Sequence, residues 1–409
     1  MNAVGSGPKR RRYLMLVQQA PWKLNGGALI RNYWMAIGVA RRYELDLIVA
    51  EQADSPPPPE FAAACASIAS FARPQGFAYT ALRVADALRP SNSYFSAGQV
   101  TRAQADHVAR MCREHAYAAI HVGDLNQYVS LPRMHCPPVW YDAHNCESAL
   151  VRRQADYERW PMSALVRIDA ARVGGVEGRI VERSIHVSAC SRDDVDDLEK
   201  LRPGAASKST VIPNGVDVAR YEPVRSAAPK PGCITLTGSM DWRPTQQGLL
   251  WFVEHVLPRL PETAGGVAVE VRVAGRMTPA LVERLRVHPR LVLVPNPPDI
   301  RDELSRAQVI AVPVLAASGS RLRLLEAWAA GRPVVTTPSG ASGLPHESGA
   351  DLMSTDDADS FAAACVRVIE DDALWARLRD GGLLRAADYD WPRIADRIVA
   401  MHERVIADA

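Results

Sequence analysis

The side chains best suited to bind an anion lie together late in the chain. Ser318, Gly319 and Ser320 form a small-residue loop between an apolar run and a helical pattern. The first turn of a helix offers unpaired backbone N–H groups to an anion. Arg321 and Arg323 add positive charge in that turn, where a helix alone favours acidic side chains. The spacing predicts a phosphate-binding loop, and an ordinary α/β crossover with a solvated arginine pair is the alternative.

The elements around this loop form a strand, loop, helix and strand. Apolar residues 309–312 predict a strand, an apolar period of 3.6 residues predicts a helix over residues 320–330, and residues 334–337 predict the next strand. Glu326 lies about a turn and a half beyond the loop on that helix. Its carboxylate would reach sugar hydroxyls that lie beyond a bound diphosphate.

The N-terminal half alternates strand and helix in the same way. Residues 13–17 and 44–50 predict strands, joined by a tight loop at Gly26 and Gly27 and by a helix. This opening is typical of a parallel sheet in an α/β protein. Between residues 60 and 116 the pattern predicts three amphipathic helices and little strand, and in the second half of the chain it predicts one helix over residues 245–260.

His144 follows a predicted buried strand at residues 138–142. Open α/β sheets bind ligands at the carboxyl ends of their parallel strands, so His144 is a candidate functional residue. A role as a helix cap or core residue is the alternative, and Asn145 is itself a candidate cap for the next helix.

Composition limits the classes of function. The chain has 409 residues, of which 47% are hydrophobic and 23% charged, and its formal net charge is +2. This predicts a globular protein of two or three domains without a strong nucleic-acid footprint. Seven scattered cysteines lack a Cys-x-x-Cys pair, so we expect reduced core residues and not disulfides or a zinc site.

One acidic run resembles a metal-binding motif in its letters alone. Asp194, Val195 and Asp196 spell D-x-D, but they lie inside a helical pattern over residues 192–201. A helix lacks the loop geometry that such a motif needs, so we predict no metal site.

Two stretches bear on membrane contact. No apolar run approaches the ~20 residues that span a bilayer, and the run after the basic residues 9–12 is too short for a signal peptide. We therefore expect a cytoplasmic protein that contacts the inner face of the cell membrane only peripherally, through residues 9–12. The arginine-rich helical run over residues 147–184 predicts a solvated face, with a membrane-facing or anionic-acceptor surface as the alternative.

Five segments together resemble the retaining group 1 glycosyltransferases of family 4, which have the GT-B fold. The segment Ser-Gly-Ser-Arg-Leu-Arg-Leu-Leu-Glu-Ala-Trp-Ala-Ala-Gly-Arg-Pro-Val-Val, which begins at Ser318, is similar to the donor-nucleotide segment of those enzymes. The other segments lie at residues 26–27, 213–217, 238–248 and 273–276. Together the five span most of the chain.

The sequence departs from the family pattern at two positions. Many members carry an acid near the transferred sugar eight residues before the position of Glu326, where this chain has Ser318. Relatives also commonly place a lysine near the phosphate-binding arginine, and Gln247 stands at that site here. A subgroup with a Gly-Ser/Thr-Arg sequence resembles this chain better, and Arg321 or Arg323 would replace the missing cation.

The resemblance implies an α/β protein of the GT-B class, with two Rossmann-like domains facing a central cleft. Residues 1–208 would form the acceptor-side domain, and residues 209–388 would form the domain that binds the nucleotide sugar. Residues 389–409 would form a helix that returns to the first domain.

The resemblance also implies an activity. The chain would be a retaining, metal-independent enzyme that moves a hexose-type sugar from a nucleoside-diphosphate sugar to a glycan, lipid-linked or small-molecule acceptor. A UDP-sugar is the favoured donor, and we expect no cofactor and no nucleic-acid partner. The alternatives are a sugar-nucleotide epimerase of the same fold and a non-catalytic partner subunit.

The resemblance assigns roles to individual residues. His144 would lie against the transferred sugar, and Arg243 and Arg321 would stabilise the leaving diphosphate. Glu326 would hold ribose hydroxyls. The donor-binding residues implied are Gly26, Gly27, Gly238, Arg243, Arg276, Ser318, Gly319, Ser320, Arg321 and Glu326.

Overall fold

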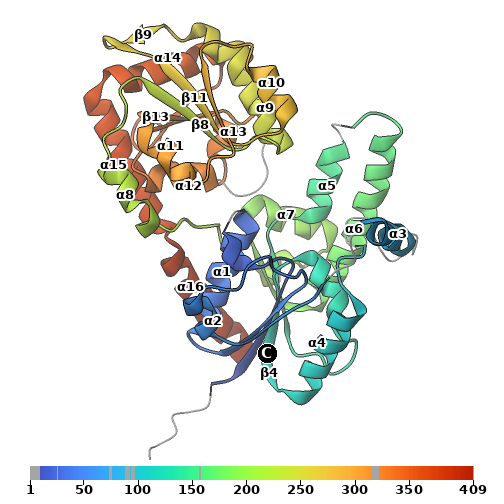
Figure 1. Ribbon diagram of the computed structural model, residues 1–409. Coiled ribbons are helices and arrows are strands. Elements are labelled where there is room, and N and C mark those ends of the chain that lie inside the picture. Colours follow the sequence, from blue (N-terminus) through green and yellow to red (C-terminus); the bar gives the residue numbers. More distant parts are fainter. Residues whose placement is uncertain are drawn as a thin grey trace, which may run out of the picture. The chain divides into compact units, whose positions relative to one another are not determined.

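The computed structural model divides the chain into two compact units (Figure 1). The structure describes residues 10–24, 26–72, 76–87, 93, 97–155, 158–315 and 322–408. Among these residues, unit 1 contains those up to Pro213 and those from Ile394 onward, and unit 2 contains those from Asn214 to Arg393. The chain passes between the units after Pro213 and after Arg393, whereas the sequence-based boundaries lie after residues 208 and 388.

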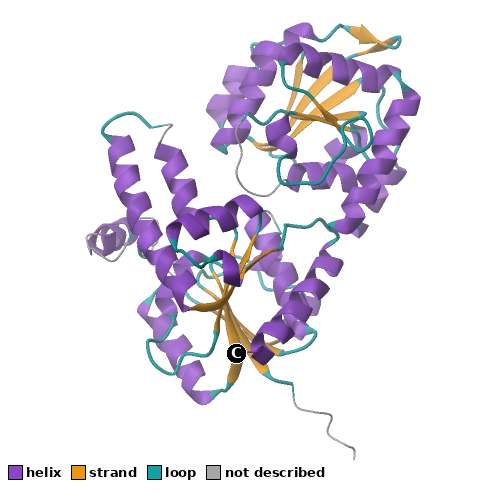
Figure 2. Cartoon of the chain, turned by 180° about the vertical axis from the view of Figure 1, so that it is seen from behind, coloured by secondary structure: helices purple, strands orange, loops and turns teal. Residues whose placement is uncertain are grey.

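Unit 1 is built around a seven-stranded parallel sheet with the order β3-β2-β1-β4-β5-β6-β7. Its strands are β1 (Arg12–Val17), β2 (Glu44–Val49), β3 (Cys65–Ser70), β4 (Tyr117–Val122), β5 (Val139–Ala143), β6 (Ser184–Ala189) and β7 (Ser209–Val211). The central strands β1 and β4 are buried along almost their whole length, because helices cover both faces of the sheet (Figure 2). The strand order reverses between β1 and β4, so the loops after these two strands flank the crevice where open α/β sheets bind ligands.

Eight helices, six to twenty-two residues long, accompany this sheet in the described part of the chain. They are α1 (Gly27–Ala40), α2 (Pro59–Ala64), α3 (Gly76–Ala87), α4 (Arg102–Glu114), α5 (Glu147–Ala155), α6 (Met162–Arg183), α7 (Arg192–Leu201) and α16 (Trp391–Asp408). Two of them begin at a side-chain cap. Thr101 accepts a hydrogen bond from the N–H of Gln104, and Ser191 accepts one from the N–H of Asp194.

The sequence did not predict β3. The expectation for residues 60–116 was three helices and little strand, and the structure has α2, α3 and α4 there together with β3. Among the described strands β3 pairs with β2 alone, at the edge of the sheet, and it is about half exposed. Its residues, Cys-Ala-Ser-Ile-Ala-Ser, include one β-branched side chain and no aromatic one, so the strand signal is weak.

Unit 2 contains a six-stranded parallel sheet with the order β12-β11-β8-β13-β14-β15. Its strands are β8 (Cys233–Ser239), β11 (Glu270–Arg276), β12 (Leu291–Pro295), β13 (Val309–Val312), β14 (Val334–Thr336) and β15 (Met353–Ser354), and β9 (Thr263–Ala264) and β10 (Val267–Ala268) form a separate antiparallel ribbon. The order reverses between β8 and β13, so the loops after these strands flank a second crevice of the same kind.

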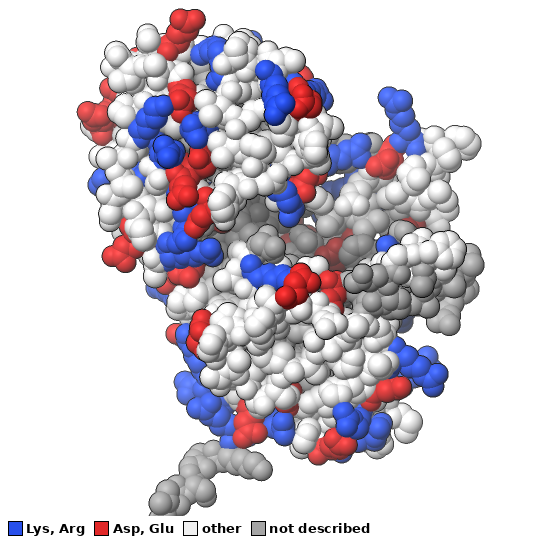
Figure 3. Space-filling model, in the orientation of Figure 1, with Lys and Arg blue, Asp and Glu red and all other residues white. Residues whose placement is uncertain are grey.

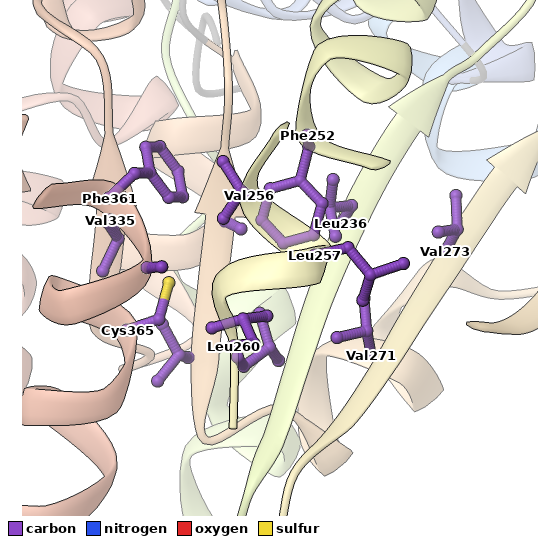
Figure 4. Close-up of a cluster of buried hydrophobic side chains, with 14 of the residues drawn as sticks. Leu236, Phe252, Val256, Leu257, Leu260, Val271, Val273, Val335, Phe361 and Cys365 are labelled. Atoms are coloured by element: carbon purple, nitrogen blue, oxygen red, sulfur yellow. The ribbon is translucent and has the colours of Figure 1, made fainter. Parts of the chain in front are cut away.

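The helices of unit 2 pack on this sheet around an apolar core. They are α8 (Glu222–Ser226), α9 (Arg243–Trp251), α10 (Pro279–Leu285), α11 (Ile300–Arg306), α12 (Leu322–Ala329), α13 (Pro338–Ala341), α14 (Ala358–Glu370) and α15 (Asp372–Asp388). In the core, the rings of Phe252 and Phe361 meet edge to face with centroids 5.9 Å apart, beside Val335 and Cys365 (Figure 4).

One predicted helix of unit 2 is broken into three pieces. The sequence predicted a single helix over residues 245–260, whereas α9 ends at Trp251 and is followed by a π-helical turn, Phe252–Val256, and a 3-10 turn, Leu257–Arg259. Pro258 has no backbone N–H to donate, so a regular α-helix cannot continue through it.

The last helix, α16, begins in unit 2 and continues in unit 1. In unit 1 its His402 is fully buried, stacks on Tyr13 at 5.5 Å and meets Trp140 edge-on at 3.9 Å. Burial and the charge of His121 hold the pKa of His402 well below its usual range, so this histidine packs as a neutral aromatic ring.

The distribution of surface charges and the state of the cysteines agree with what the composition predicted. Lys and Arg side chains are interspersed with Asp and Glu on the face shown in Figure 3. All seven cysteines are free thiols, and five of them are buried. None of the described helices is long and apolar enough to cross a membrane.

Gly248 provides a test of the packing of α9. A Cβ at Gly248 would lie 1.7 Å from the carbonyl oxygen of Pro313, so Gly248→Ala forces α9 away from the end of β13. We expect the free energy of unfolding to fall by about 1–3 kcal/mol, measured by denaturant titration. Gly178→Ala in α6 is the matched control: a Cβ there meets nothing within 4 Å, and alanine adds about 0.5–1 kcal/mol through helix propensity. A Gly248→Ala protein as stable as the control would contradict this packing.

Candidate functional site

The candidate site of unit 1 lies where β1, β4 and β5 end. A pocket of about 40 Å³ opens there, and it is lined by Gly123, Asp124, Leu125, Asn126, Tyr141, Asp142, His144 and Glu147. Asp124, directly after β4, accepts the N–H of Gln18, directly after β1, at 2.8 Å. His144, the histidine singled out in the sequence, is therefore part of a pocket at the predicted edge of the sheet.

Arg31 of α1 and Asp142 of β5 form a fully buried ion pair beside this pocket. Two N–H groups of Arg31 donate to the two carboxylate oxygens at 2.7 Å each, and a third donates to the carbonyl oxygen of Ile212 at 2.8 Å. The hydroxyl of Ser188 also donates to Asp142. The Nε2 atom of His144 lies 3.4 Å from Oδ2 of Asp142, within ion-pair distance. His144 thus lies next to a carboxylate that Arg31 holds.

The pKa values of neighbouring carboxyl groups in this pocket are shifted in opposite directions. Burial alone would raise the pKa of Asp142, but the charge and hydrogen bonds of Arg31 outweigh it and hold that pKa well below the usual range. Burial raises the pKa of Asp124. Burial and the charge of Glu177 raise the pKa of Glu147 to about 8. An ionised carboxylate therefore stands near a carboxyl group that keeps its proton at neutral pH and can donate a hydrogen bond.

Two further acids fix the start of α5 at the pocket. Glu177 of α6 accepts the first two N–H groups of α5 at 2.8 and 3.0 Å. It thereby caps the helix, a role that the sequence offered to Asn145. Asp194, from the D-x-D run in α7, accepts the N–H of Cys146 at 3.0 Å. This acid of the run therefore supports the fold from within a helix, as its helical pattern indicated.

Gly26 and Gly27 lie at the start of α1. Gly26 is the N-cap, with an extended φ of −165°, and a Cβ there would meet nothing within 4 Å. A side chain would fit, so this conformation does not itself require glycine. The pair instead leaves bare backbone at the N-terminus of α1, where no side chain caps the helix.

The candidate site of unit 2 begins with two glycines at the ends of neighbouring strands. Gly238 on β8 and Gly275 on β11 pair in register, with φ of +139° and +142°. A Cβ at Gly275 would lie 1.9 Å from the carbonyl oxygen of Gly238, so a larger residue is excluded. Cδ of Arg323 lies 2.7 Å from the position that a Cβ on Gly238 would take. Arg323 therefore lies over the end of β8, next to the crevice between β8 and β13.

Glu326 lies one turn after Arg323 on α12 and accepts a hydrogen bond from the hydroxyl of Tyr221. Burial raises the pKa of Glu326, and the bond from Tyr221 and the charge of Arg323 partly offset that rise. The carboxylate is held by one donor and retains acceptor capacity for hydroxyl groups.

The remaining predicted cations lie near the loop after β8. Arg243 is the first residue of α9 and is exposed. Gln247, in place of the family lysine, lies one turn further along that helix. Arg276 ends β11, and its Nε donates to Asp241 at 2.7 Å in an exposed ion pair.

Four residues of the predicted donor site, Ser318, Gly319, Ser320 and Arg321, lie outside the described residues. Their assignment stays a prediction from the sequence. Within the ranges that the structure describes, no cluster of three or more His, Cys, Asp or Glu side chains has a metal-binding arrangement.

Sequence reasoning did not find Arg31 or Glu177. Arg31 lies 111 residues before Asp142, and no local spacing connects the two. The available signal was a charged residue inside the mostly apolar run that forms α1. Glu177 had no distinguishing signal, because it is one of several acids in an arginine-rich helix.

Two family models match consecutive parts of this chain. Residues 25–220 match the model "Glycosyltransferase Family 4", and residues 232–371 match the model "Glycosyl transferases group 1". Together the two matches cover most of the chain and follow the order expected from its motifs. The chain belongs to the group 1, family 4 glycosyltransferases.

Two curated relatives of this family member are mycobacterial. A phosphatidyl-myo-inositol mannosyltransferase from Mycolicibacterium smegmatis is 28% identical over 239 residues, 54% of this chain and 59% of the relative. A glycogen synthase from Mycobacterium tuberculosis is 27% identical over 266 residues, 63% of this chain and 62% of the relative. The match therefore spans less than two thirds of each relative.

Solved structures with the same fold cover nearly the whole chain. Sucrose-phosphate synthase from Thermosynechococcus elongatus has a TM-score of 0.69 at 16% identity, covering 98% of this chain and 100% of its own. HepE of Anabaena, in complex with UDP and glucose, has a TM-score of 0.66 at 15% identity, covering 96% and 99%. This group 1 member thus has two parallel-sheet, Rossmann-like α/β domains of the GT-B class.

The buried pair of Arg31 and Asp142 is open to a direct test. Asp142→Asn leaves the buried charge of Arg31 without a carboxylate, and we expect a loss of about 3–5 kcal/mol in the free energy of unfolding. Asp241→Asn is the matched control, because its ion pair with Arg276 is exposed and contributes under about 1 kcal/mol. Equal losses in the two variants at pH 7 would contradict the account.

The same variant predicts a pH dependence. The folded state lowers the pKa of Asp142. The contribution of Asp142 to the free energy of unfolding is therefore fully present above the pKa of the unfolded chain, about 3.9, and is lost as the pH falls through the pKa of the folded state. The stability difference between wild type and Asp142→Asn should therefore stay constant from pH 8 to pH 5, measured by the same denaturant titrations.

Proposed function

We propose that this chain transfers a hexose-type sugar from a nucleoside-diphosphate sugar, preferably a UDP-sugar, to a glycan, lipid-linked or small-molecule acceptor, with retention at the anomeric carbon. The observation that carries the proposal is the crevice of unit 2. There a constrained glycine pair, a covering Arg323 and a Tyr221-bound Glu326 meet at the strand ends of a group 1 domain. The mannosyltransferase and glycogen synthase among the relatives, and the UDP and glucose bound to HepE, support a sugar nucleotide as donor.

In this proposal the donor diphosphate lies against Gly238 and Gly275, where bare backbone allows close approach. Arg323 and Arg243, together with Arg321 as predicted from the sequence, oppose the negative charge that grows on the diphosphate as the glycosidic bond breaks. The ribose hydroxyls donate to Glu326. Ser318 and Gln247 do not weaken this assignment, because Arg323 on α12 supplies positive charge.

In unit 1, His144 contacts the hydroxyl groups of the transferred sugar in this proposal. Asp142 orients its ring, and Glu147 is a further donor in the same pocket. The acceptor hydroxyl attacks the anomeric carbon on the face that the diphosphate leaves, and its proton passes to a phosphate oxygen of the leaving group. One C–O bond forms, one breaks, and no protein nucleophile or metal ion is needed.

The first test is product analysis. Thermal stabilisation by UDP, GDP and ADP identifies the donor base, and we expect the largest shift with UDP. With the matching sugar nucleotide and an acceptor mixture, the anomeric configuration of the product should equal that of the donor, measured by NMR spectroscopy. Exhaustive EDTA treatment should leave the rate unchanged, because arginines and helix N–H groups stabilise the leaving group.

Three outcomes would change the proposal. Release of free UDP and an epimerised sugar without an acceptor would indicate the epimerase. Nucleotide binding without turnover on any acceptor would indicate a non-catalytic partner subunit. Activity that disappears with EDTA and returns with Mg²⁺ or Mn²⁺ would overturn the charge-stabilisation account.

The second test separates two residues on α12. Arg323→Ala should lower kcat by about 10²–10³-fold, roughly 2.7–4 kcal/mol, because its interaction strengthens in the transition state. Glu326→Gln should raise the donor KM with kcat nearly unchanged, because ribose is bound equally in the ground and transition states. Steady-state kinetics with varied donor decides both.

The control for these variants is Arg286→Ala at the C-cap of α10. Arg286 forms an exposed ion pair with Glu283, away from the strand ends, and its removal should change neither parameter. Arg321→Ala should resemble Arg323→Ala if the sequence assignment is right. A wild-type kcat in Arg323→Ala, or an unchanged donor KM in Glu326→Gln, would make this helix a scaffold only.

A further inference from the structure

Four large apolar side chains are exposed within nine residues at the start of α6. Trp160 is 84% exposed, and Met162, Leu165 and Ile168 are 50%, 56% and 55% exposed. The last three recur at every third position, which places them on one side of the helix. These four residues are here named the α6 apolar face.

The α6 apolar face lies at the outer end of a helical hairpin. In both views α5 and α6 run side by side and project from the sheet of unit 1 (Figures 1 and 2). The second half of α6 is anchored in the core of the unit through Val173, Val176 and Ile180. The buried inner half therefore stabilises the hairpin. It does not account for the exposed apolar side chains at the outer end.

Positive charge accompanies these apolar side chains. Residues 152–172 contain five arginines and three acids. Arg159 and Arg167 are exposed and lie next to Trp160 and Ile168 in the chain. Basic residues beside an exposed apolar helix face, with tryptophan at one end, are typical of helices that lie in the interface of an anionic membrane.

We infer that the α6 apolar face docks unit 1 onto an anionic lipid bilayer. The four apolar side chains enter the boundary between headgroups and acyl chains, and the arginines meet lipid phosphates. A bilayer is a better partner for this face than a second copy of the chain. A fluid lipid interface needs no pocket that is complementary to the hairpin end, and anionic lipid attracts the net positive charge of the hairpin. The inference goes beyond the proposed function, since docking does not depend on sugar transfer.

This surface replaces the contact expected from residues 9–12. Arg12 donates two hydrogen bonds of 3.0 Å to the carboxylate of Asp46, and Arg10 donates to the carbonyl oxygen of Ala40 at 3.3 Å. These two charges are engaged within unit 1. The hairpin combines basic residues with exposed apolar area.

Flotation of the full-length chain with lipid vesicles tests the inference. The wild type should float with vesicles that mix phosphatidylglycerol and phosphatidylcholine, less so at high salt, and weakly with phosphatidylcholine alone. Leu165→Glu/Ile168→Glu should lower the partition coefficient at least roughly tenfold, since it removes apolar area and adds like charge to that of the lipid. Val287→Glu/Leu384→Glu is the matched control in unit 2, where the two side chains are 74% and 75% exposed, and it should float like the wild type.

Two additional measurements keep the test decisive. Leu165→Ser/Ile168→Ser removes the apolar area without adding charge and should also reduce flotation, with an unfolding midpoint equal to that of the wild type. Light scattering after gel filtration measures the oligomeric state. Absence of wild-type flotation, or flotation that both α6 variants retain, overturns the inference. A dimer that the α6 variants dissociate, without flotation, would identify the face as a contact between copies.

Discussion

The buried ion pair between Arg31 and Asp142 is the constraint on which the candidate site of unit 1 depends. A guanidinium and a carboxylate are tolerated away from water only together, because either alone is an uncompensated charge. Arg31 lies on the helix that follows β1, and Asp142 lies near the end of β5, so the pair connects both sides of the crevice. Arg31 also holds the carbonyl of Ile212, next to the junction after Pro213. The guanidinium of Arg31 thus connects the end of β5, next to His144, with the segment through which the chain leaves the unit.

In unit 2 the strand ends beside the crevice expose main-chain atoms. Gly238 and Gly275 bring two strand ends so close that the carbonyl of one fills the space of a side chain on the other. Arg323 then lies over Gly238 and adds a cation where a ligand can reach main-chain atoms. In both units the strand order of the sheet reverses beside the first strand. The candidate site of unit 1 lies next to a buried ion pair, whereas that of unit 2 lies next to two glycines without side chains.

Periodicity was sufficient to predict most elements, and it failed where tertiary structure decides. The helical pattern over residues 192–201 has the bounds of α7, so Asp194 and Asp196 lie on a helix as predicted. The edge strand β3 was missed because its small residues carry little signal, and the helix after β8 is broken at a proline. At the end of β11 the sequence singled out the segment 273–276, but only the structure shows that Gly275 is the position where the neighbouring strand excludes a side chain. The partner of Asp142 lies 111 residues away, a distance that no local pattern can bridge.

The hydrogen bond between Tyr221 and Glu326 indicates which part of a donor belongs beside α12. Burial and the charge of Glu326 raise the pKa of Tyr221, so its hydroxyl keeps the proton and acts as the donor. Glu326 is therefore the acceptor in this pair, and its remaining capacity as a carboxylate is for further acceptance. Phosphate oxygens are acceptors too, and placing them here would leave the carboxylate unsatisfied and repelled. Hydroxyl groups are donors and fit. In the proposed donor complex the ribose therefore lies at Glu326, and the diphosphate lies one turn earlier, at Arg323.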